Sequence, residues 1–176
     1  MDLVLEKNDI CTAHKSVFGL PNLYYKPVVT EFLGMEIIEE PSVDEMIRAY
    51  YIENASKTFG YYTGIRSVNR RNGTTQVPVK VEIISNNVDI NTIHIDSGTT
   101  YIIHPTEKII NSDNAIYLEL LDDLEKHRDV LEISPEEFIK HNADRAKLEF
   151  KRFIEIINKY KYSDKTKEVV VNAFAQ

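Results

Sequence analysis

The chain has 176 residues, 43% of them hydrophobic, which suits one folded domain with a buried core. Its 28 acidic and 21 basic residues give a formal net charge of −7, which argues against general nucleic-acid binding because phosphate contacts need clustered Lys and Arg. A single cysteine, Cys11, excludes an intrachain disulfide, and no run of about 20 apolar residues could span a membrane, so we expect a cytoplasmic protein without a signal peptide.

Residues 1–40 are predicted to form an irregular N-terminal segment. Pro21 and Pro27 interrupt it, and its clearest element is a short strand at Met35–Glu40. No pair of amphipathic helices can be placed before residue 40, so a winged helix is not expected there. Residues 41–176 are predicted to form a single α+β domain whose helical part covers 114–176.

The domain is predicted to begin with a helix at Ser42. Ser42 and Glu45 have the spacing of a capping box, and Ile47 and Tyr51 follow at helical spacing. An extended aromatic segment, Thr58–Tyr62, comes next and is expected to add a strand to the sheet.

Residues Gly64–Pro78 combine a short basic helix with a polar hinge. Gly73 can take a positive φ and end the helix, and Pro78 favours an extended chain that starts the next strand. The helix carries three arginines that, together with a nearby lysine, form a candidate patch for nucleic acid or an acidic partner. These are Arg66, Arg70, Arg71 and Lys80. The alternative interpretation is a charged surface helix paired with acids from elsewhere.

A three-stranded antiparallel meander is predicted over residues 79–104. Val79, Val81 and Ile83 alternate with polar residues, as one half-buried face requires. Ile93 and Ile95 are assigned to the same buried face, with His94 on the solvated face. The sequence Asp96-Ser97-Gly98 is interpreted as the hairpin loop, which places His94 opposite Thr100.

The rest of the chain is predicted to be helical. Residues 114–126 carry an apolar stripe, and a solvated face is the default interpretation of its acids, Glu119, Asp122 and Asp123. Ser134 and Pro135 mark the start of a long helix, about 135–160, with a heptad-like seam. That seam either packs on the sheet or forms a homo-oligomer. A last helix starts near Ser163.

Sequence motifs for catalysis are not found. There is no phosphate-binding loop, dinucleotide fingerprint or nucleophile elbow, and the five histidines lack the spacing of a zinc site. We therefore predict a protein that is not an enzyme and that carries no cofactor and no metal. An enzyme whose site is assembled from distant residues stays open as an alternative, and a cleft that clusters carboxylates or histidines would favour it.

The order Tyr62-Thr63-Gly64, Asn69 and Gly73-Thr74-Thr75-Gln76-Val77-Pro78, followed by an apolar strand, resembles the C-terminal domain of AbiEi-type proteins. The resemblance covers about residues 41–104. Members of this family are the antitoxin partners of AbiE toxin–antitoxin systems, and the family is implied to bind operator DNA through an N-terminal winged helix. The matching motif positions, which carry no assigned chemistry, are Tyr62, Gly64, Asn69, Thr75, Gln76 and Pro78.

The resemblance implies a regulatory binding protein, an antitoxin or transcriptional repressor of a mobile-element or phage-defence locus. A protein partner is expected, and DNA binding would depend on the arginine patch because the winged helix is missing. The alternative is an inhibitor encoded by a phage or mobile element, an anti-defence protein that acts by protein–protein binding. Exposed tyrosines would suit either role.

Overall fold

The computed structural model describes the chain except for residues 1–10, 13–23, 26–27, 40, 55–56 and 176. By its internal contacts the chain divides into two units, Met1–Ala49 and Tyr50–Gln176. The first unit contains two antiparallel pairs, β1 (Cys11–Thr12) with β2 (Tyr24–Tyr25) and β3 (Val28–Phe32) with β4 (Met35–Glu39). The strand predicted at residues 35–40 is thus confirmed as β4.

Helix α1 (Val43–Tyr51) begins in the first unit at the predicted capping box. Ser42 Oγ accepts a hydrogen bond from the Glu45 amide at 3.3 Å, and Glu45 Oε2 accepts one from the Ser42 amide at 2.8 Å. The short pair β5 (Glu53–Asn54) and β6 (Lys57–Thr58) follows at the start of the second unit.

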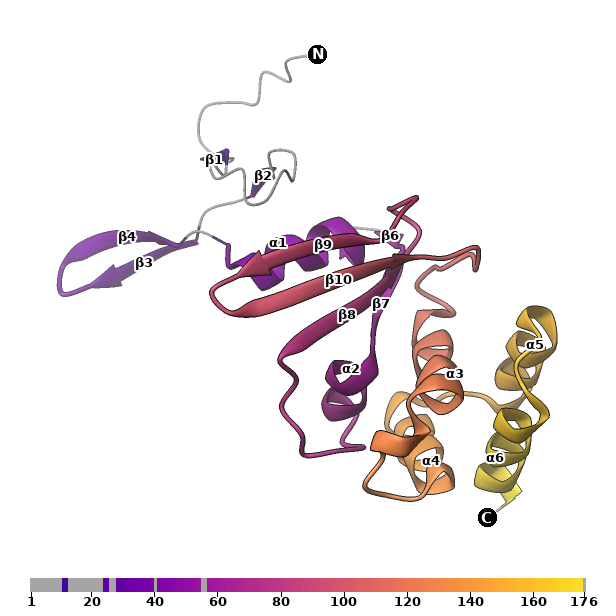
Figure 1. Ribbon diagram of the computed structural model, residues 1–176. Helices are drawn as coiled ribbons and strands as arrows, with labels where there is room; N and C mark the ends of the chain where they lie inside the picture. Colours follow the sequence, from indigo (N-terminus) through magenta and orange to yellow (C-terminus); the bar gives the residue numbers. More distant parts are fainter. Residues whose placement is uncertain (1–10, 13–23, 26–27, 40, 55–56, 176) are drawn as a thin grey trace. The chain divides into compact units, whose positions relative to one another are not determined.

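The second unit is built on a four-stranded sheet in the order β7-β8-β10-β9. Its strands are β7 (Gly60–Thr63), β8 (Lys80–Ser85), β9 (Thr92–Asp96) and β10 (Thr99–Pro105) (Figure 1). The α+β class is confirmed, and β7 is the strand predicted to join the sheet. The meander is wrong, because β10 pairs with β8 in parallel and β9 lies at the edge.

Burial and one side-chain anchor explain this strand order. Val81, Ile83 and Ile84 of β8 are all buried, so both faces of β8 are covered and it suits an inner position. The chain leaves β8 at Asn86, whose side-chain amide donates to the carbonyl oxygens of Thr106 and Lys108. Those residues follow β10, so Asn86 ties the end of β8 to the end of its parallel neighbour.

The predicted face of β9 is also wrong. His94 pairs with Tyr101 and is buried, whereas Ile93 and Ile95 are 61% and 59% exposed. The loop has two residues, Ser97 (φ 47°) and Gly98 (φ 87°), as a type I′ turn requires, and not the predicted three. This difference of one residue turns every side chain of β9 to the other face.

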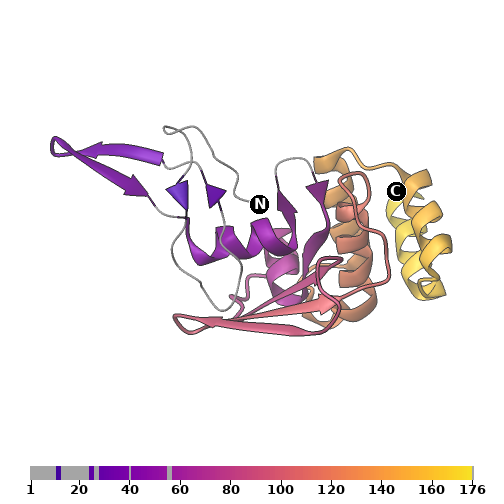
Figure 2. The ribbon, with the colours of Figure 1, turned by 90° about the horizontal axis from the view of Figure 1, so that it is seen from above.

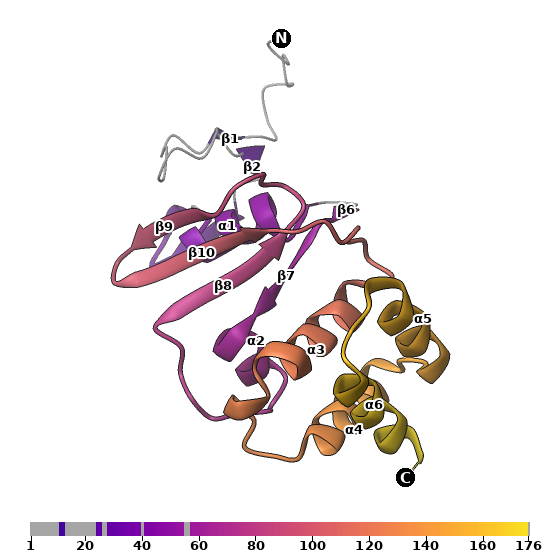
Figure 3. The same cartoon turned by 45° about the vertical axis from the view of Figure 1, so that its right-hand side comes forward.

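The helices that follow the sheet form the core of the second unit. They are α3 (Ala115–Lys126), α4 (Pro135–Ala146), α5 (Phe150–Tyr160) and α6 (Asp164–Ala175), with a 3₁₀ turn at Arg128–Val130. Helix α3 contacts β7, and α5 and α6 contact α3 from another side (Figures 1 and 3). Figure 2 shows the same four helices grouped together. Helix α3 is therefore the central helix of this unit.

The predicted helix over 135–160 is two helices. Lys147 adopts a left-handed conformation (φ 55°, ψ 45°) that ends α4, and α5 starts three residues later at Phe150. The break lets Phe138 and Ile139 of α4 and Phe153 of α5 enter one buried cluster with α3 and α6. The capping box at Ser134 is confirmed, since Ser134 and Glu137 exchange both hydrogen bonds.

Candidate functional site

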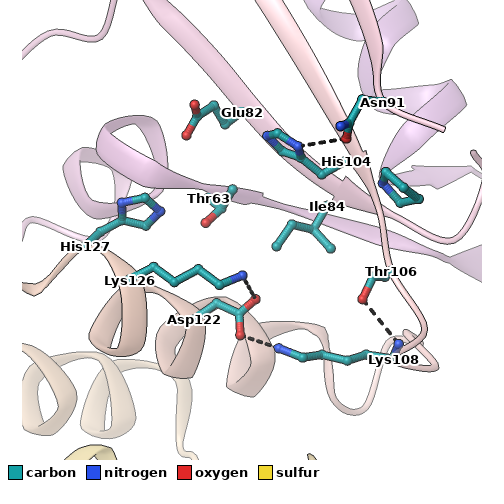
Figure 4. A pocket seen from close by; sticks show the side chains of 11 residues that line it. Thr63, Glu82, Ile84, Asn91, His104, Thr106, Lys108, Asp122, Lys126 and His127 are labelled. Carbon is teal, nitrogen blue, oxygen red and sulfur yellow. Dashed lines mark hydrogen bonds and ion pairs between the residues drawn. The ribbon is translucent and has the colours of Figure 1, made fainter.

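A polar pocket of about 410 Å³ lies in the second unit, between the sheet and the C-terminal half of α3. Its lining comes from the end of β7, strands β8 and β10, the loop after β10, and α3, together with Asn91 before β9 and His127 directly after α3 (Figure 4). Its polar lining includes Thr63, Glu82, His104, Lys108, Asp122, Lys126 and His127. A cleft that gathers carboxylates and histidines is the feature that sequence reasoning did not find.

The strand register explains why these residues meet. Thr63 of β7 pairs with Glu82 of β8, and Ile84 of β8 pairs with His104 of β10. Paired residues share a face of the sheet, so all four side chains lie on the face that α3 partly covers. Buried Ile84 forms the apolar floor of the pocket.

Helix α2 (Gly64–Arg70) starts beside this pocket, and its first residue must be glycine. Gly64 has φ +70°, and a Cβ there would lie 2.7 Å from Glu82 Oε2 and 3.9 Å from His127 Cε1. The carboxylate of Glu82 and the ring of His127 therefore approach the same point from two elements. Burial lowers the pKa of His127, and the nearby Glu82 carboxylate opposes this shift without cancelling it.

Asp122 is the most heavily bonded group of the pocket, although it was assigned to a solvated face. Its side chain is 1% exposed, and it accepts hydrogen bonds from Lys108, Tyr162 and Tyr61, the last at 3.0 Å. Lys126 lies 3.6 Å away. Burial alone would raise the pKa of Asp122, but Lys108, Tyr162 and Lys126 more than offset it and hold the pKa below its usual value.

Glu119 and Asp123 form a second buried acidic site on α3, next to α2. Both contradict the predicted solvated face, being 4% and 0% exposed. Ser67 Oγ lies 2.9 Å from Glu119 Oε1 and 2.5 Å from Asp123 Oδ2, and Arg71 forms an ion pair with Glu119. Burial raises the pKa of Asp123 well above its usual value.

The single hydrogen of the Ser67 hydroxyl limits the direction of these bonds. A hydroxyl has one hydrogen, so Ser67 can donate to only one of the two carboxyl groups. Because burial raises the pKa of Asp123 and Arg71 forms an ion pair with Glu119, we expect Asp123 to be the protonated carboxyl group, which donates to Ser67 while Ser67 donates to Glu119. Asp123 Oδ1 has no hydrogen-bond partner among the described residues, as expected for a neutral carboxyl group.

Asp123→Asn is expected to stabilise the protein increasingly as the pH rises. The folded-state pKa of Asp123 is raised, so its favourable contribution is complete below the unfolded pKa, about 3.9, and is lost as the pH rises through the folded pKa. Asparagine does not titrate and keeps a donor for Ser67. The unfolding free energy of the variant minus that of the wild type should grow by about 1.4 kcal/mol per pH unit in that interval.

Urea denaturation at a series of pH values from 4 upward measures this difference. Asp113→Asn, at an exposed position of the same chain, serves as the control and should show no such slope. A difference that is flat with pH, or that falls, would contradict a neutral Asp123.

The predicted arginine patch does not stay together. Arg70 and Arg66 lie over the ring of Tyr62, at 4.4 and 5.8 Å from its centroid, whereas Arg71 turns to Glu119 on α3. Ile83 of β8 is paired with Tyr62, so both lie on the same face of the sheet. Lys80 is three residues before Ile83 on the same strand and therefore points to the opposite face. A basic surface through this region would consist of Arg66 and Arg70.

The motif positions after α2 have structural contacts. Asn69 donates to the carbonyl oxygens of Thr74 and Gln76, and Glu132 accepts from the Thr75 amide at 2.9 Å and from the Thr74 hydroxyl at 2.7 Å. Gly73 does not take a positive φ; the left-handed residue that follows the helix is Asn72 (φ 59°). Gly73 is needed for space, because a Cβ would lie 2.7 to 2.9 Å from three core side chains, Val68, Phe138 and Leu131.

His94, the other histidine of the sheet, lies on the face opposite His104. Its Nε2 is 2.8 Å from the hydroxyl of Tyr51, and burial lowers its pKa. In the part of the chain that the structure describes, no three His, Cys, Asp or Glu side chains are grouped closely enough to hold a metal ion.

Comparison of the chain with known protein families, with curated proteins and with solved structures gives no match. Across the described ranges, none of the helices has the length and apolar character needed to cross a bilayer.

Proposed function

We propose that this chain is a regulatory binding protein of the cytoplasm that acts, like an AbiEi-type antitoxin, by binding a protein partner without catalysis. The observation that supports it is an apolar row on the sheet of the second unit. Ile93 and Ile95 are adjacent on one face of β9 and largely exposed, and Ile93 is paired with half-buried Ile102 of β10. Exposed apolar rows of this kind mark surfaces that bind another protein.

The position of β9 adds to this argument. It is an edge strand of the four-stranded sheet, so its outer backbone groups can pair with a strand of a partner. On this face of the sheet, helix α3 covers the edge formed by β7. The apolar row lies at the other edge, on β9 (Figure 3). A partner could complete the layer that α3 begins.

The test is a binding and growth assay with a nucleotidyltransferase toxin of the AbiE type. We expect co-expression of this chain to restore growth, and the double variant Ile93→Thr/Ile95→Thr to weaken the complex at least about tenfold, because two large apolar groups leave the interface. Threonine keeps the strand preference of a β-branched residue. Ile109→Thr, at a position 66% exposed outside the sheet, is the matched control.

Failure to bind or neutralise the toxin would reject the antitoxin proposal. The anti-defence alternative predicts instead that the chain inhibits a host defence protein with no toxin present, through the same apolar row.

DNA binding through Arg66 and Arg70 predicts a salt-dependent shift of promoter DNA that Arg66→Ala/Arg70→Ala abolishes. An enzymatic role is favoured by one observation only, the cleft that holds Glu82, His104 and His127.

A further inference from the structure

Three groups that line the pocket make no hydrogen bond or ion pair with another described side chain. Thr63 is 4% exposed, and its Oγ1 has no hydrogen-bond partner among the described residues. No hydrogen bond or ion pair joins the carboxylate of Glu82, or the ring of His127, to another described side chain. Buried polar groups are normally hydrogen-bonded, so the unsatisfied hydroxyl of Thr63, beside two half-buried groups that also make no hydrogen bond among the described residues, points to a ligand in this cavity.

The fourth polar group, His104, is fixed in orientation. Its Nδ1 is 3.1 Å from Asn91 Oδ1, an acceptor, so Nδ1 carries a hydrogen and donates to it. In a neutral ring this leaves Nε2 as an acceptor. Figure 4 shows the ring of His104 between the side chains of Glu82 and Asn91. This end of the pocket is rich in hydrogen-bond acceptors, and the carboxylate of Glu82 gives it one negative charge.

The other end of the pocket carries positive charge. Lys108 and Lys126 both approach Asp122, so two ammonium groups share one carboxylate and leave a surplus of one positive charge. The side chain of Lys126 is 54% exposed and is held at 3.6 Å, so it can turn to a ligand. The two ends differ in sign, and the pocket as a whole is close to neutral.

We propose that this pocket binds a small zwitterionic molecule, with its amino group on Glu82 and its anionic group, a carboxylate or a phosphate monoester, beside Lys126. Thr63 and the acceptor nitrogen of His104 complete the hydrogen bonds of the amino end. A ligand that carries only a negative charge would leave the carboxylate of Glu82 without a partner. A ligand that carries only a positive charge would leave the surplus lysine charge without a counter-ion. The volume of about 410 Å³ lies within the range of ordinary small-molecule sites.

Free amino acids and aminoalkyl phosphates share this chemistry. The experiment is a thermal-shift screen of the purified full chain against the twenty standard amino acids and phosphoethanolamine, followed by titration calorimetry of every compound that raises the melting temperature. Propionate and propylamine, which carry one charge each, are the ligand controls. We expect at least one zwitterion to bind and both single-charge compounds to bind at least about tenfold more weakly.

Two variants locate the site. Glu82→Gln and Lys126→Gln should each weaken the binding of the zwitterion at least about tenfold, because each removes one charged hydrogen-bonding partner of the ligand, and Glu82→Gln also keeps the shape of the side chain. Glu107→Gln and Lys151→Gln, at exposed positions outside the pocket, are matched controls and should bind as the wild type does. Circular dichroism confirms that the variants are folded.

Two results would overturn the proposal: no zwitterion of either class binds, or binding is unchanged in both pocket variants. Binding of propionate as tightly as the zwitterion, with Glu82→Gln unaffected, would also reject it. The assay contains no toxin or DNA, so its outcome is independent of the proposed antitoxin role.

Discussion

Replacing Asp122 with alanine is expected to lower the free energy of unfolding by about 3 kcal/mol. The substitution leaves the ammonium group of Lys108 without its counter-charge and removes an acceptor from the buried hydroxyl of Tyr61. Removing one partner of a buried ion pair commonly costs about 3–5 kcal/mol. We expect the lower end of this range, because Lys108 and Lys126 can both turn towards water. Urea denaturation measures the loss, with the wild type and the variant compared at the same m-value, the slope of the unfolding free energy with urea concentration.

The effect of Asp122 should also depend on pH, with the opposite sign to that of Asp123. The folded-state pKa of Asp122 is lowered, so its contribution is present above the unfolded pKa and is lost as the pH falls through the folded pKa. The destabilisation by Asp122→Asn should therefore shrink below about pH 4.

Glu107→Ala is the surface control for Asp122→Ala and should change stability by less than about 0.5 kcal/mol. The double variant Asp122→Asn/Lys108→Met tests the pair itself, because its loss should be smaller than the sum of the two single losses. Additive losses would mean that Asp122 and Lys108 are not energetically coupled, and an Asp122→Ala variant as stable as the control would mean that the network does not contribute to folding.

Local signals in the sequence were enough for the elements that they mark. The capping residues Ser42 and Ser134 predicted the starts of α1 and α4, and the alternation of Val79, Val81 and Ile83 predicted β8. The buried position predicted for Val79 is wrong, because Val79 lies before the strand and is 76% exposed. The signals failed where one residue decides the geometry. Lys147 splits the long helix, although its sequence continues the apolar seam. The two-residue turn at Ser97 and Gly98 reverses β9, because the sequence does not say where its loop begins.

The candidate site could not be predicted, because α3 is covered on more than one side. An acid that lies off the apolar stripe of a surface helix faces water, but on a central helix it faces another element. Asp122 meets Tyr61 from β7, Lys108 from the loop after β10 and Tyr162 from the segment after α5. These partners lie up to 61 positions away, and no local spacing relates them. The separation of Arg71 from Arg66 and Arg70 has the same cause, since Arg71 pairs with Glu119 across the fold.

Gly60→Ala is expected to cost about 3 kcal/mol of stability, the upper end of the range for overpacking. A Cβ at this position would lie 2.0 Å from the carbonyl oxygen of Tyr51 and 2.8 Å from that of Ile84. Both obstacles are backbone atoms, so no side-chain rotation can relieve the clash. Moving the chain would break the bond from the Gly60 amide to Ile52 and the pairing of Gly60 with Ser85, which joins β7 to β8.

Gly98→Ala separates this steric effect from the conformational one. Gly98 has φ +87° and open space around a Cβ, so alanine there should cost only about 1 kcal/mol, from the left-handed backbone. Gly60 has no positive φ, and its cost comes from contact alone. Denaturation of both variants under the same conditions gives the comparison. If Gly60→Ala proves as stable as Gly98→Ala, the close approach of the Tyr51 carbonyl to β7 is wrong.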